Sequence, residues 1–165
     1  MSYDIFVWLS CAVALPSALP EPHTWEYHRF TEEQVAGYPK EIAEELVGSE
    51  SWGLKRTAFY LNVSRMDRKV MSRHRLQELV PGLQVMTIQA PLPPGDPGPT
   101  ARDRELAARA KVGRAGISVV QEGFSDPGWA MQKTVARHLA RACGGAIVET
   151  PDGYIELDAN GRMVE

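Results

Sequence analysis

The side chains of this sequence that could act as metal ligands, nucleophiles or acid–base groups are not spaced for any of these roles. His23 and His28 are five residues apart, so they share no helix face and form no histidine–carboxylate metal motif. Cys11 and Cys143 lie in apolar surroundings without zinc-site spacing, and we expect buried, reduced thiols. Glycine-rich phosphate loops and the serine nucleophile motif are missing. The sequence therefore predicts no catalytic residue, no metal and no cofactor.

Charge is the stronger signal, because it is segregated along the chain. Residues 1–50 carry a net charge of −7, residues 51–141 one of +8, and residues 142–165 one of −4. Opposite charges of this kind either pair across the folded chain or form separate surfaces for partners. Since folding brings distant segments together, pairing within the molecule is our expectation.

Two sets of charged side chains are candidates for contact with a partner protein. Three basic residues recur every four positions and so form one stripe on a helix, where they need compensation by acidic groups, the helix dipole or a partner. An acidic helix face could dock a basic protein, although a plain solvated face is the alternative. Tryptophan is enriched at interfaces. The candidate partner-binding residues are Glu41, Glu44, Glu45, Trp52, Lys133, Arg137 and Arg141.

The basic run in residues 65–75 leaves a nucleic-acid-binding accessory domain open as a further alternative. Such clusters bind phosphates with release of counterions. This run has no interleaved aromatic residues, however, and the chain as a whole is acidic. A solvated or internally paired face is the interpretation that these features favour.

The size and composition fit one globular domain over residues 1–165. The chain is 44% hydrophobic and 24% charged, which is ordinary for a folded domain. The apolar run over residues 5–15 is too short to span a bilayer, no lysine or arginine precedes it, and Asp4 stands before it. We therefore predict a buried strand there, no membrane association and a cytoplasmic location.

The pattern of elements predicts an α+β fold. We expect a mixed or mostly antiparallel sheet with helices packed on one face and ferredoxin-like elements. The clearest segment is 116–157, with a strand, a helix capped by Asp126 and ended by Gly144, and two strands joined by a turn. The other predicted elements are strands at 3–15, 23–30, 54–63 and 83–90, helices from Thr31, at 65–79 and at 100–112, and a proline-rich surface loop at 91–99.

The opening MSYDIFVW, the SDP helix start, and the LARACGG helix end before AIVETPDGYIE resemble the small α/β immunity proteins encoded beside bacterial polymorphic toxins. The resemblance covers about forty residues near the C-terminus and eight at the start. It implies a non-catalytic protein that binds a cognate toxin and blocks its action. The alternative to such a binding module is a small enzyme or ligand-binding domain with a pocket near the 91–99 loop.

Overall fold

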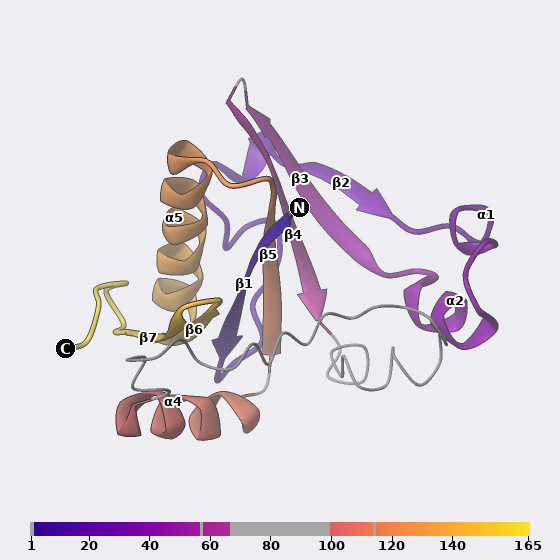
Figure 1. The fold of residues 1–165 in the computed structure, drawn as a ribbon. Helices are drawn as coiled ribbons and strands as arrows, with labels where there is room; N and C mark the ends of the chain where they lie inside the picture. The colour runs from indigo at the N-terminus through magenta and orange to yellow at the C-terminus, as the bar shows by residue number, and fades with distance from the viewer. Residues whose placement is uncertain (1, 57, 67–99, 114) are drawn as a thin grey trace.

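The computed structural model describes residues 2–56, 58–66, 100–113 and 115–165, and these contain a seven-stranded sheet (Figure 1). The strand order is β2-β3-β4-β5-β1-β6-β7, and every neighbouring pair is antiparallel. This confirms an α+β domain with an antiparallel sheet. The strands are β1 (Ser2–Leu9), β2 (Glu26–Arg29), β3 (Glu50–Arg56), β4 (Phe59–Met66), β5 (Ala115–Glu122), β6 (Ala146–Thr150) and β7 (Gly153–Leu157).

The helices differ greatly in length. Those described are η1 (Pro22–Thr24), α1 (Glu32–Val35), α2 (Lys40–Leu46), α4 (Ala101–Lys111) and α5 (Asp126–Cys143). Thr31 and Thr100 cap α1 and α4, as the sequence predicts, and each forms a capping box with the residue three positions later. Among the described residues, no helix has the length and apolar character needed to span a lipid bilayer.

Alternation along β1 sets the two faces of the sheet. Ile5, Val7 and Leu9 are buried in the main core together with the apolar stripe of α5. Trp8 points to the opposite face, where it packs with Leu106 and other residues of a second, smaller cluster beneath α4. The prediction that the helices pack on one face is therefore not confirmed, because α4 and α5 contact opposite faces. The ferredoxin-like layout is not confirmed either.

The crossover from β5 through α5 to β6 follows the predicted pattern closely. Both strands pair with β1, so they run in the same direction on either side of it. Ser125 caps α5 by accepting from Gly128 N–H, one residue before the predicted cap at Asp126. Gly144, with φ of 77°, ends the helix in the left-handed conformation that glycine adopts without strain.

Residues 10–25, which we call the strap, cover the part of the main core beside α5. The predicted strand 3–15 ends at Leu9, and the chain then turns and bends without pairing in the sheet. Val13, Leu19 and Trp25 of the strap are nevertheless buried in the main core, with residues of β3 and β4. The apolar run is thus half strand and half strap, because apolar content alone does not distinguish a strand from a buried loop.

Two further predictions concern the middle of the chain. The predicted single strand 54–63 is wrong, because β3 and β4 form a hairpin over this segment. The sequence between the two strands is a threonine and an alanine, and neither type is a typical turn former, so the sequence marks no break there. Arg65 and Met66, predicted to begin a helix, belong to β4. The rest of that helix, the strand 83–90 and the loop 91–99 lie outside the described residues.

The start of α5 gives a first testable prediction. A β-carbon at Gly128 would overlap the side-chain oxygen of Gln121 and lie 2.8 Å from Ser125 Oγ. Alanine normally favours a helix over glycine by about 1 kcal/mol. We expect Gly128→Ala instead to lower the free energy of unfolding by about 1–3 kcal/mol, because the buried amide and the cap must move.

Urea unfolding measures this change, and Gly37→Ala is the matched control. A β-carbon at Gly37 meets nothing within 4 Å, so its effect should stay within about 0.5 kcal/mol. Equal effects of the two substitutions would contradict close packing at Gly128.

Candidate functional site

Residues 26–50, which we call the acidic arm, are a strongly acidic part of the chain that the structure describes. The arm contains β2, α1 and α2, and its sequence has seven acidic and two basic residues. The two helices pack mainly against each other and lie on the side of the sheet away from α5, at the right of Figure 1. The acidic arm is therefore remote from the basic stripe of α5.

The carboxylates of the acidic arm have little compensation inside the molecule. Glu41 and Glu44 are exposed on α2, and Glu45 belongs to the same helix. Within the described part of the chain, the only ion pair of the arm joins Lys40 Nζ to Glu44 Oε1 at 3.8 Å. An exposed pair of this kind contributes little stability. Glu41 and Glu44 thus lie on a surface that a basic partner could reach.

Exposed rings accompany these carboxylates. Tyr27 and Tyr38 expose 55% and 54% of their surface. The Tyr27 hydroxyl donates to Glu50 Oε1 at 2.7 Å, and this hydrogen bond to a carboxylate raises the pKa of Tyr27. Neither tyrosine is among the predicted binding residues, because nothing in a local pattern distinguishes an exposed ring from a buried one. Aromatic residues such as tyrosine are enriched at protein interfaces.

Strand β2 ends the sheet, so it has one unpaired edge among the described strands. Phe30 N–H donates to Ser49 O, and Gly48 N–H donates to Phe30 O, so the backbone of residue 30 faces β3. In an antiparallel pair the direction alternates with each residue. The backbone groups of Arg29 and Tyr27 therefore face outward, where another chain could pair with them.

The basic stripe of α5 is formed as predicted, since Lys133, Arg137 and Arg141 are all exposed on this helix. Lys133 Nζ lies 5.4 Å from the centre of the Trp129 ring, and Arg141 Nε donates to the Asn160 carbonyl at 2.9 Å. The described residues provide no acidic partner for these three cations. The expected pairing between the acidic start of the chain and this stripe is not seen among them.

Trp52 belongs to the interior. Its exposed fraction is 4%, and its ring packs edge-to-face with Tyr27 at 5.7 Å. The predicted candidate therefore does not reach the surface, and Tyr27 is the ring that does. The cross-strand pair explains this, because Tyr27 on the edge strand lies opposite Trp52 and covers it.

Charges do pair across the chain at α4. Arg109 Nη2 donates to Glu156 Oε1 at 2.7 Å, and Arg102 also pairs with Glu156. Asp103 Oδ1 accepts from Tyr154 N–H at 3.3 Å. These contacts join the basic middle of the chain to its acidic end and hold α4 on β7. Internal pairing, expected from the charge pattern, is thus confirmed here but not in the acidic arm.

A cavity of about 620 Å3 lies beside this ion-pair cluster. Its charged groups already have structural partners: Arg109 binds Glu156, and Asp158 Oδ1 accepts from the backbone N–H of Asn160 and of Arg162. A carboxylate or guanidinium group held in such contacts is a poor general acid or base in catalysis. The cavity is lined by Trp8, Leu9, Ser10, Arg109, Val112, Gly113, Gly144, Gly145, Ala146, Ile147, Glu156, Leu157, Asp158, Ala159 and Val164.

The Glu156 cluster predicts an acid-sensitive contribution to stability. The hydrogen bond from Arg109 lowers the pKa of Glu156 below its ordinary value of about 4.3. The unfolded chain then binds this proton more readily than the folded one. The stabilisation is complete above the unfolded pKa and is lost as pH falls through the folded pKa. We expect Glu156→Gln to cost about 1 kcal/mol at pH 7 and less as the pH is lowered to 3.

Urea unfolding at pH 7 and pH 3 tests this contribution. Glu122→Gln is the control, because Glu122 is an exposed glutamate at the end of β5. A constant cost of Glu156→Gln across this pH range would contradict the role of the ion pair.

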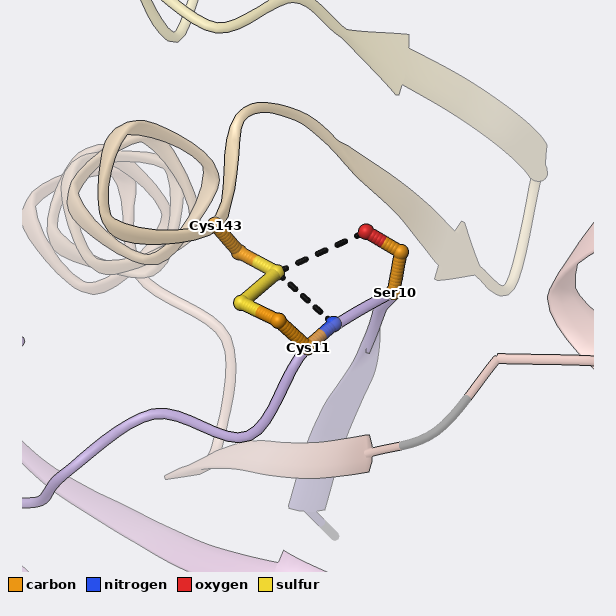
Figure 2. Close-up of a disulfide and its surroundings, with 3 residues drawn as sticks. All are labelled: Ser10, Cys11 and Cys143. Carbon is orange, nitrogen blue, oxygen red and sulfur yellow. Dashed lines mark hydrogen bonds between the residues drawn. A yellow bond between two sulfur atoms is a disulfide. The ribbon is translucent and has the colours of Figure 1, made fainter.

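The expectation of two reduced thiols is wrong. Cys11 and Cys143 form a disulfide that joins the start of the strap to the last residue of α5 (Figure 2). Cys143 Sγ also accepts hydrogen bonds from Cys11 N–H at 2.9 Å and from the Ser10 hydroxyl at 3.6 Å. The sequence could not indicate this pair, because the strap brings together two residues 132 positions apart.

In the described residues, no group of three or more histidine, cysteine, aspartate or glutamate side chains could hold a metal ion. No family model, curated protein or solved structure matches this chain.

Proposed function

We propose that this protein is a non-catalytic binding module, and that it acts as a bacterial immunity protein that neutralises a toxin by direct binding. The observation that carries the proposal is the acidic arm. Its exposed carboxylates have few ion pairs inside the molecule, and exposed tyrosines accompany them. Complementary charge accelerates the encounter of two proteins and discriminates against wrong partners. The partner is therefore a protein with a basic contact surface.

The resemblance of the chain to immunity proteins supports the toxin as the class of partner. The paired state of the charged groups in the α4 cavity supports binding rather than catalysis. A cytoplasmic location belongs to the same proposal. The disulfide favours an oxidising compartment, so localisation of a tagged chain by cell fractionation tests this part separately.

Binding is tested with the purified protein and the purified product of an adjacent toxin gene. We expect a one-to-one complex in calorimetry and protection of cells that express the toxin. A toxin that neither binds the protein nor is inhibited by it would overturn the proposal.

The acidic arm gives the matching mutational prediction. We expect Glu41→Lys/Glu44→Lys to weaken toxin binding by at least about tenfold at low salt, mainly through slower association. Glu122→Lys/Asp152→Lys makes the same change in net charge at exposed positions outside the arm and should have a much smaller effect. Equal losses in the two variants would show that net charge, and not the acidic arm, governs binding.

A further inference from the structure

Side-chain contacts and one covalent bond hold the strap on the rest of the protein. Its regular structure is limited to the short turn of η1, so side chains and not a backbone ladder hold most of it. Val13, Leu19 and Trp25 are buried in the main core, and Cys11, Leu15 and Ala18 pack against it. The carbonyl of Val13 accepts from Arg65 Nη2 at 2.8 Å, and Glu21 pairs with Arg56 at 2.9 Å. The disulfide is the covalent contact at the start of the strap. Such a segment can loosen while the sheet stays folded.

The disulfide is placed where a reductant can reach it. Cys11 and Cys143 are both half-buried, and their neighbours Ser10, Ala142 and Gly144 are exposed. Ser10 and Gly144 also line the cavity beside α4. The bond therefore lies at the surface, between the strap and the end of α5 (Figure 2).

The two sulfur atoms are not equivalent. The Cys11 N–H and the Ser10 hydroxyl both point to Cys143 Sγ, as the dashed lines in Figure 2 show. Donors of this kind stabilise a thiolate on the sulfur that accepts them. A sulfur that is stabilised as a thiolate is the better leaving group in thiol–disulfide exchange. The negative end of α5 acts against a thiolate at Cys143, and these two donors act in favour of one.

We propose that the Cys11–Cys143 disulfide is a redox-responsive clamp that a dithiol opens in the folded protein, releasing the strap from α5. A thiolate of the dithiol attacks Cys11 Sγ, the bond between the two cysteines breaks, and its electron pair remains on Cys143 Sγ. The second thiol of the reductant then attacks the mixed disulfide and displaces Cys11. The protein gains two electrons and two protons, and the dithiol is oxidised to its own disulfide. The clamp is closed in oxidising compartments and open in reducing ones.

The first test measures the bond and the response of the strap. The oxidised protein, denatured without reductant, should react with no thiol reagent, and after dithiothreitol it should react at two cysteines. Deuterium labelling for a few seconds should then become at least about tenfold faster in residues 10–25, while β5 and the middle of α5 stay protected. Two reactive thiols before reduction, an unchanged strap, or loss of protection throughout the chain would each overturn the clamp.

The second test identifies the attacked sulfur. Brief exposure to glutathione, followed by acid quench and peptide mass mapping, should find the mixed disulfide mainly on Cys11. Ser10→Ala should slow opening by roughly two- to fivefold, because one donor to the leaving sulfur is lost. Ser17→Ala removes an exposed hydroxyl of the same strap, which binds the Ala14 carbonyl, and should not change the rate. A mixed disulfide mainly on Cys143 would overturn the assigned direction of attack.

Discussion

Replacing both Cys11 and Cys143 by serine is expected to lower the free energy of unfolding by about 3–5 kcal/mol. The bond joins residues 132 positions apart, so it removes many conformations from the unfolded chain. In the loop-entropy description, a loop of this length gives an effect near the upper end of the usual range. The folded sheet and α5 lose little else, because the core contacts between them do not involve the bond.

Urea unfolding of the oxidised wild type and of the variant measures this loss. Dithiothreitol should bring the wild type to the stability of the variant and should leave the variant unchanged. A difference below about 1 kcal/mol would show that the bond does not constrain the unfolded chain. This outcome is independent of the clamp, which concerns the folded state.

Local signals explain why some elements could be predicted. Thr100 begins α4 with a capping box, and Gly144 ends α5, because each interaction involves residues within one helical turn. Pro127 marks the first turn of α5, although the cap is Ser125. The strands β6 and β7 follow from the short turn between them. Signals confined to a few neighbouring residues can be read from one sequence.

Features that depend on distant residues could not be predicted. The opposite placement of α4 and α5 results from contacts between the middle of the chain and its two ends. The disulfide also depends on distant residues, since the fold of the strap decides whether Cys11 lies close to Cys143. Burial of Trp52 depends on Tyr27 across the strand pair. The acidic residues of the arm were predicted because charge is visible in the sequence, but its exposed rings were not.

A pair of buried amides supports the second prediction with a large effect. Gln121 and Gln132 are both fully buried. Gln132 Oε1 accepts from Gln121 Nε2 at 2.6 Å, and Gln132 Nε2 donates to the carbonyls of Tyr3 and Val119, each at 2.9 Å. Gln121 Oε1 accepts from Ser125 N–H at the start of α5. The Gln132 side chain thus connects α5 to β1 through Tyr3 and to β5 through Val119.

We expect Gln132→Met to lower the free energy of unfolding by about 2–4 kcal/mol. Methionine keeps the length of the side chain and suits a helix, so packing and helix propensity change little. The buried Gln121 amide loses its partner, however, and an unsatisfied buried group costs about 1–3 kcal/mol. The carbonyls of Tyr3 and Val119 each lose one hydrogen bond as well. Urea unfolding with near-ultraviolet circular dichroism as the signal measures this change.

The double variant Gln121→Met/Gln132→Met separates the network from simple loss of packing. If the two amides act as a pair, the double variant should cost less than the sum of the single variants, by at least about 1 kcal/mol, because no unpaired amide remains between them. Additive effects would mean that each glutamine acts through its own backbone contacts alone. In that case the contacts of Gln132 with Tyr3 and Val119 would hold α5 on the sheet without help from Gln121.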